Sequence, residues 1–266
     1  MLSVDGSHTP ELVSLQPGRI ACVTMQRTGA LNAFDIEMAV ALRHACEQAL
    51  QDKATRVLVL RGLPRAFSAG GDAACMRADP ARNPARIIEP LHALIAALAQ
   101  APIPVIAAVQ GVAAGGAVGL ALACDVVIAS SNTRFNLAYA RLGASCDCAV
   151  SWTLPRLLGW RRALHMLMLE PEFDAQAALR WGLANQVVEA ADLETTVLAV
   201  AQRLAQGPRA SWAEMKRLLR QSSEFALPQQ LQAEAEAFAR CAASADFSEG
   251  LAAFAEKRAP VFGRGA

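Results

Sequence analysis

The stretch Pro104–Ala129, PVIAAVQGVAAGGAVGLALACDVVIA, decides the fold that we predict for this chain. Val105–Val109 is a short apolar run rich in β-branched residues, which is typical of a buried strand. Ala113–Gly116, with two adjacent glycines, then brings bare backbone into the first turn of an expected helix that runs to about Ala123. The first N–H groups of a helix lack partners within it, so they can bind an anion or a developing oxyanion. Close helix packing would explain the same two glycines, and both interpretations stand at this point.

The composition suits a large globular protein. The chain has 266 residues, 54% of them hydrophobic, which is enough to bury a sizeable core. Its net charge is +1 and its Lys and Arg residues are scattered, so we expect no nucleic-acid partner. Seven cysteines without a CxxC pair indicate buried thiols in a reducing compartment rather than disulfides. No secretory or transit signal is visible, which predicts a cytoplasmic protein.

One apolar run raises the question of a membrane partner. Ile103–Cys124 is uncharged and long enough to span a bilayer. However, Gln110 and four glycines interrupt it, and Asp125 closes it. We therefore expect a buried strand and helix here and no membrane span.

Strands and helices alternate in the first half of the chain. Leu12–Leu15 and Ile20–Met25 flank a Gln-Pro-Gly-Arg turn and predict a hairpin. Asp35 is expected to cap a helix that runs to about Gln51, and Val57–Leu60 follows as a buried strand. From Cys148 onward the patterns are mainly helical. We therefore predict an α/β fold, with a core over residues 1–206 and a helical C-terminal region over residues 207–266.

The absence of several motifs narrows the range of reactions that the chain could catalyse. The sequence has no GxSxG elbow, no P-loop, no HExxH and no paired CxxC, so hydrolase, nucleotidase and zinc-site functions have no local support. Two glycine-rich turns remain, one at Arg61–Asp72, which we expect to be a loop, and one at Ala113–Gly116. One N–H group from each turn could converge on a carbonyl oxygen and stabilise an enolate or a tetrahedral oxyanion.

Three segments carry a family resemblance. They are AFSAGGD at residues 66–72 with LNA before it at 31–33, the central stretch at 104–129, and FNLAYARLGASCDCAVSWTLPRLLG at 135–159. In order and spacing they resemble the crotonase (enoyl-CoA hydratase/isomerase) superfamily, and FAEKR at 254–258 resembles the family's C-terminal helix. The resemblance implies a spiral of ββα turns with a helical C-terminal trimerisation region, assembled as a homotrimer or a dimer of trimers. It also implies acyl-CoA thioester substrates, with coenzyme A as part of the substrate and no separate cofactor.

The resemblance also implies site residues. The oxyanion hole would be the backbone N–H groups of Ala69 and Gly116. Lys257 would reach the phosphates of coenzyme A, in its own or a neighbouring subunit, and Ala33 and Asp72 would lie near the coenzyme A path. The full set of implied substrate-binding positions is Ala33, Gly70, Asp72, Gly115, Tyr139 and Lys257.

The chain departs from the family at two positions. Hydratases of the family use two glutamates, and the matching positions hold Gly119 and Tyr139. Glycine moves no proton and an ordinary tyrosine stays protonated at neutral pH, so two-glutamate hydration is not expected. Asp147 lies where an isomerase-like branch keeps a single acid/base aspartate. Our leading interpretation is therefore an enoyl-CoA isomerase in which Asp147 takes a proton at one carbon and returns it two carbons away.

Several alternatives stay open. Asp147 could instead cap the helix expected to start near Cys148. His92, Tyr139 and Asp147 fall where an aryl-CoA dehalogenase branch has a histidine, a tryptophan and a nucleophilic aspartate, although a histidine beside an apolar helical stripe is more often a packed core residue. Enoyl-CoA hydratase activity and a non-catalytic acyl-CoA-binding role are the remaining alternatives. Cys146 and Cys148 flank Asp147 too closely for a metal site, and none is expected.

Overall fold

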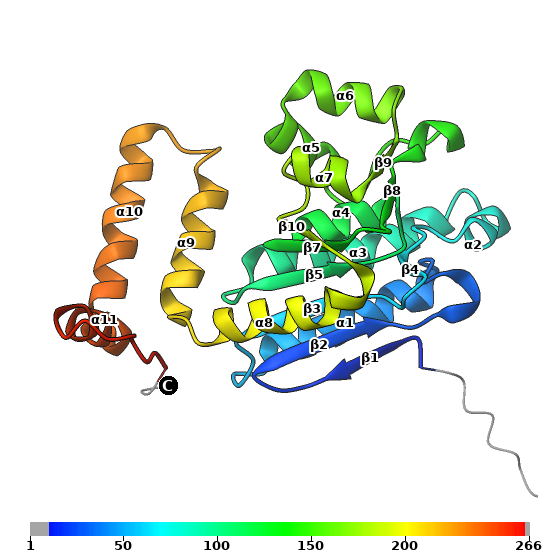
Figure 1. The fold of residues 1–266 in the computed structure, drawn as a ribbon. Helices are drawn as coiled ribbons and strands as arrows, with labels where there is room; N and C mark the ends of the chain where they lie inside the picture. Colours follow the sequence, from blue (N-terminus) through cyan, green and yellow to red (C-terminus); the bar gives the residue numbers. More distant parts are fainter. Residues whose placement is uncertain (1–10, 264–266) are drawn as a thin grey trace, which may run out of the picture.

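Within residues 11–263, which the computed structural model describes, the strands form two sheets (Figure 1). The strands are β1 (Val13–Gln16), β2 (Ile20–Met25), β3 (Val57–Arg61), β4 (Ala66–Ser68), β5 (Val105–Val109), β6 (Val112–Ala114), β7 (Val126–Ser130), β8 (Arg134–Asn136), β9 (Glu172–Asp174) and β10 (Gln186–Val188). The larger sheet has the order β1-β2-β3-β5-β7-β10 and is parallel except for the β1–β2 hairpin. The smaller sheet has the order β4-β6-β8-β9, and only β9 is antiparallel to its neighbour.

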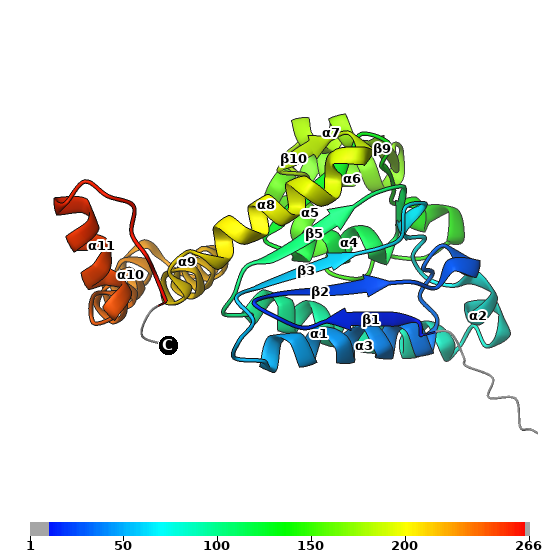
Figure 2. The ribbon, with the colours of Figure 1, turned by 60° about the horizontal axis from the view of Figure 1, so that its bottom comes forward.

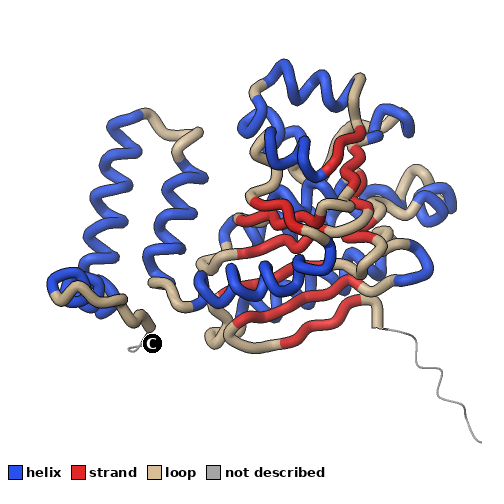
Figure 3. Tube along the Cα trace, viewed as in Figure 1, coloured by secondary structure: helices blue, strands red, loops and turns tan. Residues whose placement is uncertain are grey.

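Most of the helices lie around these sheets, and those at the C-terminal end stand apart from them, as the colouring of Figure 3 shows. The α-helices are α1 (Ile36–Gln51), α2 (Ala73–Ala78), α3 (Asn83–Gln100), α4 (Gly116–Ala123), α5 (Val150–Leu158), α6 (Trp160–Met168), α7 (Ala175–Arg180), α8 (Leu193–Ala205), α9 (Arg209–Gln221), α10 (Leu227–Ala242) and α11 (Ala245–Ala255). Short 3-10 helices lie at η1 (Thr28–Ala30), η2 (Ala138–Leu142) and η3 (Ala190–Asp192). Asp35 caps α1 as predicted, because its side chain accepts the N–H of Met38 at 2.8 Å.

The larger sheet is covered on both faces, with α1 and α3 on one side and α8 on the other (Figure 2). In β3, Leu58 and Leu60 point into the cluster that includes α1 and α3, whereas Val57 and Val59 point into the cluster that includes α8. Side chains alternate across a strand, and both faces of this strand are buried. That is why β3 is a continuous apolar run in the sequence.

Successive strands alternate between the two sheets. β3 is followed by β4, β5 by β6 and β7 by β8, so the chain contributes first to the larger sheet and then to the smaller one. This is the spiral of ββα turns that the family resemblance implied. The sequence pattern alone predicted loop at residues 66–68 and a helix start at 113–114, and both predictions were wrong. Each of β4 and β6 has only three residues, too few to show the alternation of apolar and polar residues that marks a strand. Each is defined instead by pairing with distant segments.

The last three helices form a C-terminal arm, α9–α11, that stands apart from the core in both ribbon views (Figures 1 and 2). α9 is joined to the core through Lys216, whose ammonium lies 2.6 Å from the Asp125 carboxylate and donates to the Ile103 carbonyl at 2.8 Å. Within residues 11–263, no helix combines the length and apolarity that crossing a bilayer requires.

Candidate active site

The first part of the candidate site is the start of α4. β6 ends at Ala114, and Gly115 makes the turn with a φ of +52° and a ψ of −124°, a conformation that suits glycine. α4 then begins at Gly116, and its residues are apolar on every side and almost entirely buried, so the helix is locked in the core. Among the described residues, the N–H of Gly116 has no hydrogen-bond acceptor. This donor at the positive end of a helix is therefore available to a ligand oxygen.

The second part is the turn after β4, and here the structure corrects the sequence-based assignment. The N–H of Ala69 already donates to the Leu31 carbonyl at 2.9 Å, so it is not available to a substrate. The N–H of Gly70 donates to the Ser68 hydroxyl at 3.1 Å. The N–H of Gly71 takes no acceptor among the described residues. The available donor in this turn is thus two residues beyond the predicted one.

The two glycine turns touch each other. A methyl group added to Gly70 would lie 2.5 Å from the carbonyl oxygen of Ala114, which ends β6. The turn is held from its other side by Phe34, whose N–H donates to the Gly70 carbonyl at 2.7 Å and whose carbonyl accepts the N–H of Asp72 at 2.9 Å. The predicted residues Gly70 and Gly115 are therefore neighbours, although they lie 45 positions apart in the chain.

The carboxylate of Asp147 lies against the start of α4. A methyl group on Gly116 would be 3.2 Å from Asp147 Oδ1 and 3.6 Å from Oδ2. Tyr139 Oη donates a hydrogen bond to Asp147 Oδ1 at 2.8 Å. Burial raises the pKa of the Tyr139 phenol, and the charge of Asp147 together with this hydrogen bond raises it further. Tyr139 therefore stays protonated at neutral pH and acts as a donor that orients the carboxylate.

The alternative that Asp147 merely caps a helix is wrong. α5 begins at Val150 rather than at Cys148, and its N-cap residue is Ala149, with no side-chain capping bond. Only the backbone carbonyl of Asp147 contributes, by accepting the N–H of Val150 at 3.0 Å. The Asp147 side chain is thus directed to Tyr139 and α4 instead of to the helix that follows it.

His92 and Cys148 complete the surroundings of Asp147. His92 is exposed at the edge of α3, not packed in the core, and its Nε2 accepts the backbone N–H of Cys148 at 3.1 Å. Cys148 is buried, and burial followed by the charge of Asp147 raises the pKa of its thiol. The thiol is therefore protonated at neutral pH and is not a nucleophile.

The backbone of Cys148 also explains why position 119 holds a glycine. A side chain on Gly119 would overlap the carbonyl oxygen of Cys148 and would begin 2.8 Å from its Cβ. The loop that carries Asp147 thus fills the space that a side chain would need at position 119, which the family resemblance matches to the first glutamate of hydratases. In this chain, the second such position is Tyr139, which carries no carboxylate.

Of the remaining predicted residues, Ala33 and Asp72 lie beside the second turn, whereas Lys257 lies on the C-terminal arm. Ala33 is buried beside the second turn, where its carbonyl accepts from Arg27 Nη1 at 2.9 Å. Asp72 caps α2 and pairs with the same Arg27 nitrogen at 2.7 Å, and these contacts lower its pKa, the backbone hydrogen bond from Cys75 most of all. Lys257 is exposed and follows α11, and Figure 1 shows α11 on the C-terminal arm, away from β4 and α4 of the same chain.

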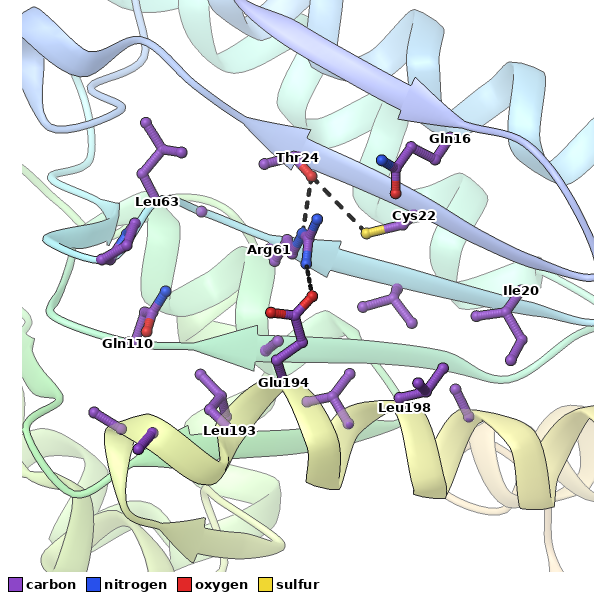
Figure 4. Close-up of a pocket in the computed structure, with 18 of the residues that line it drawn as sticks. Gln16, Ile20, Cys22, Thr24, Arg61, Leu63, Gln110, Leu193, Glu194 and Leu198 are labelled. Carbon is purple, nitrogen blue, oxygen red and sulfur yellow. Dashed lines mark hydrogen bonds and ion pairs between the residues drawn. The ribbon is translucent and has the colours of Figure 1, made fainter.

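A cavity of about 790 Å³ lies elsewhere, between α8 and the strands β2 and β3 (Figure 4). Its walls are mostly aliphatic, and its polar side holds Arg61, which donates to Thr24 at 3.0 Å and pairs with Glu194 at 3.2 Å. None of the predicted site residues lines it. The backbone N–H groups without acceptors among the described residues and the Asp147 carboxylate lie at the glycine turns instead, and these turns form the candidate site. Among residues 11–263, no group of His, Cys, Asp and Glu side chains is arranged to hold a metal ion.

Comparison with known proteins gives the family and supports the fold. The family model described as enoyl-CoA hydratase/isomerase matches residues 16–265. A Rhodobacter capsulatus protein named "Probable enoyl-CoA hydratase" is 37% identical over 243 residues, covering 91% of this chain and 94% of the relative. The 1,2-epoxyphenylacetyl-CoA isomerase of Escherichia coli is 35% identical over 247 residues, with the same coverage. The crystal structure of an enoyl-CoA hydratase from Polaromonas sp. JS666 superimposes with a TM-score of 0.88 at 34% identity, covering 93% of this chain and 98% of that one.

Proposed function

The chain belongs to the enoyl-CoA hydratase/isomerase family of the crotonase superfamily, and we propose that within it this enzyme shifts a double bond in an enoyl-CoA thioester. The observation that carries the proposal is the Asp147 carboxylate against the start of α4, while a hydratase's first glutamate position is closed by Cys148. A double-bond shift needs one group that both accepts and returns a proton, whereas two-carboxylate hydration needs a second.

The thioester oxygen would bind between two backbone donors. We propose the N–H groups of Gly116 and Gly71, both of which lack acceptors among the described residues, in turns that touch through Gly70 and Ala114. The negative charge that develops on the thioester oxygen would be stabilised by about 3 kcal/mol for each preorganised donor. Gly71 thus replaces Ala69 as the proposed partner of Gly116.

Asp147 would carry the proton. In a 3-enoyl thioester, the carboxylate takes a proton from C2, and the electrons of that C–H bond form the enolate whose oxygen lies between the two N–H groups. The protonated Asp147 then delivers the proton to C4, the double bond moves to C2–C3, and the thioester carbonyl is restored. Tyr139 would donate to Asp147 throughout, because its raised pKa prevents it from acting as the base.

The dehalogenase alternative has less support. In that chemistry His92 would need a ring nitrogen with a free lone pair, but Nε2 uses its lone pair to accept the N–H of Cys148, and Nδ1 carries the proton of the neutral ring. Hydratase activity has less support because Cys148 occupies the volume beside Gly119 that a glutamate side chain would need. A non-catalytic acyl-CoA-binding role differs from our proposal in one respect, since it predicts binding without turnover.

The assembly that we propose is a homotrimer or a dimer of trimers. The C-terminal arm exposes large apolar side chains in the single chain, with Leu219 75%, Phe238 67% and Phe254 87% exposed. Burying such side chains against another copy would stabilise both subunits. Lys257 would then approach the coenzyme A phosphates bound by a neighbouring subunit.

The test is the substitution Asp147→Asn. Asparagine keeps the size and the acceptor oxygen but cannot take up a proton, so we expect turnover of a 3-enoyl-CoA panel to fall at least about 100-fold. Wild-type enzyme should also exchange the C2 protons of a saturated acyl-CoA in D₂O, and the variant should not. As a control, calorimetric binding of the same acyl-CoA should be nearly unchanged. Undiminished turnover in the variant, or wild-type binding without exchange or turnover, would refute the proposal.

A further inference from the structure

The loop that carries Asp147 has an unusual backbone. Cys148 and Ala149 have backbone φ angles of +48° and +61°, values that residues other than glycine rarely adopt. Two such residues in succession persist only where surrounding contacts fix them. The contacts of Cys148 therefore bear directly on where its neighbour Asp147 points.

Cys148 is held between two helices. On one side it packs on α4, since its Sγ would lie 2.8 Å from a methyl group on Gly116 and its carbonyl covers Gly119. On the other side its N–H donates to His92 Nε2 on α3 at 3.1 Å, and no other acceptor for it is found among the described residues. Cys148 is completely buried, so without His92 this N–H would be an unpaired donor inside the protein.

The hydrogen bond also fixes what His92 can do. To accept an N–H, Nε2 must carry no proton and must commit its lone pair to Cys148. The lone pair that a proton carrier would need is therefore already in use. Nδ1 then carries the proton of the neutral ring, so neither nitrogen has a lone pair free to take a proton from the substrate, and the contact that His92 makes is with the backbone of Cys148.

We infer that His92 is a positioning residue, which fixes Cys148 between α3 and α4 and thereby aims the carboxylate of Asp147 at the start of α4. This inference rests on the proposed role of Asp147 as the acid/base. It differs from a catalytic role for His92, because the side chain of His92 exchanges no proton with the substrate.

Two substitutions at one position separate these roles. His92→Leu removes the acceptor, whereas His92→Gln offers a side-chain oxygen that can accept the Cys148 N–H without the proton chemistry of an imidazole. The matched control is His44→Leu, at an exposed histidine of α1 whose ring lies beside Arg43. The measurements are hydrogen exchange of the Cys148 amide, and kcat and KM for a 3-enoyl-CoA.

In His92→Leu we expect the Cys148 amide to exchange roughly tenfold faster, and kcat to fall roughly tenfold with KM within about twofold of wild type. His92→Gln should restore both within about threefold, and His44→Leu should change neither. Unchanged amide exchange in His92→Leu would overturn the inference, as would faster exchange with an unchanged kcat. A His92→Gln enzyme that protects the amide but is as slow as His92→Leu would show that His92 carries a proton.

These measurements are distinct from the test of the proposed function. If Asp147→Asn retained full turnover, the acid/base role would fail, yet the exchange of the Cys148 amide would still report the hydrogen bond to His92. If Asp147→Asn is inactive while His92→Leu is normal in both measurements, the acid/base role survives and the positioning role does not.

Discussion

The two turns that meet at the candidate site are held by different forces. On the α4 side, the fit is steric, because Gly116 and Gly119 lie so close to Cys148 that no side chain fits on Gly119. On the β4 side, polar groups hold the turn. The buried Asn32 amide donates to the carbonyls of Ala66 and Phe67 at 3.0 and 3.2 Å, and the Ser68 hydroxyl donates to the Asn32 carbonyl at 2.7 Å.

A single arginine extends the polar side. Arg27 pairs with Asp72 at 2.7 Å and with Asp35 at 2.9 Å, and these two carboxylates cap α2 and α1. Because one turn is held by close packing and the other by polar groups, substitutions should affect their stability in different ways. The stability of the α4 side should respond to added atoms, whereas the stability of the β4 side should respond to the loss of a charge.

The largest effect is expected from Gly119→Ala on the steric side. The new methyl group would overlap the Cys148 carbonyl, so either α4 or the Asp147 loop must move, at a cost of about 2–3 kcal/mol in the free energy of unfolding. Urea denaturation with an unchanged m-value measures this cost. Gly29→Ala is the control, because a methyl group there meets no atom within 4 Å, and it should stay within about 0.5 kcal/mol of wild type. Equal stability of the two variants would show that the α4 side is not sterically tight.

Tyr139→Phe tests the hydrogen bond that Tyr139 makes on the α4 side, where the other contacts are close packing. The change removes the hydrogen bond to Asp147 Oδ1 and leaves the buried ring in place. A hydrogen bond to a charged group contributes about 1.5–3 kcal/mol, so we expect kcat to fall roughly 10-fold to 100-fold if the bond orients the base. Steady-state kinetics with a 3-enoyl-CoA gives this number, and thermal unfolding checks that the fold is kept. A kcat equal to that of wild type would mean that α4 and Cys148 alone orient Asp147.

The sequence predicted the elements that show a regular spacing of apolar residues or a capping residue. The hairpin of β1 and β2, the capped helix α1 and the central strand β5 follow from local patterns, and the structure confirms them. The three-residue strands β4 and β6 could not be predicted in this way, because pairing between distant segments defines them. Only the family resemblance supplied the spiral that contains them.

The site was predictable in its neighbourhood but not in its hydrogen bonds. The motif AFSAGGD marks the second turn, yet which of its N–H groups is available depends on Leu31, whose carbonyl takes the N–H of Ala69. Likewise, the contact of His92 with Cys148 joins residues 56 positions apart, and no local pattern links them. Gly119 was identified as a missing carboxylate, but the reason that no larger residue fits there, the Cys148 backbone, needs the folded loop.

The smallest effect is expected from Asp72→Asn on the β4 side, and it should depend on pH. Asparagine can still cap α2, so the loss is mainly the ion pair with Arg27, about 1 kcal/mol. Because folding lowers the pKa of Asp72, its carboxylate stabilises the native state above the unfolded-state pKa of about 3.9, and this stabilisation disappears as pH falls through the folded-state pKa. The difference in unfolding free energy between wild type and variant should therefore be constant from about pH 7 to 5 and shrink below about pH 4. Glu194→Gln, which breaks the more exposed pair with Arg61, is the control and should cost less than about 0.5 kcal/mol. A difference that persists unchanged at low pH would mean that Arg27 and Asp72 act through packing, and the contrast between the two turns would then be lost.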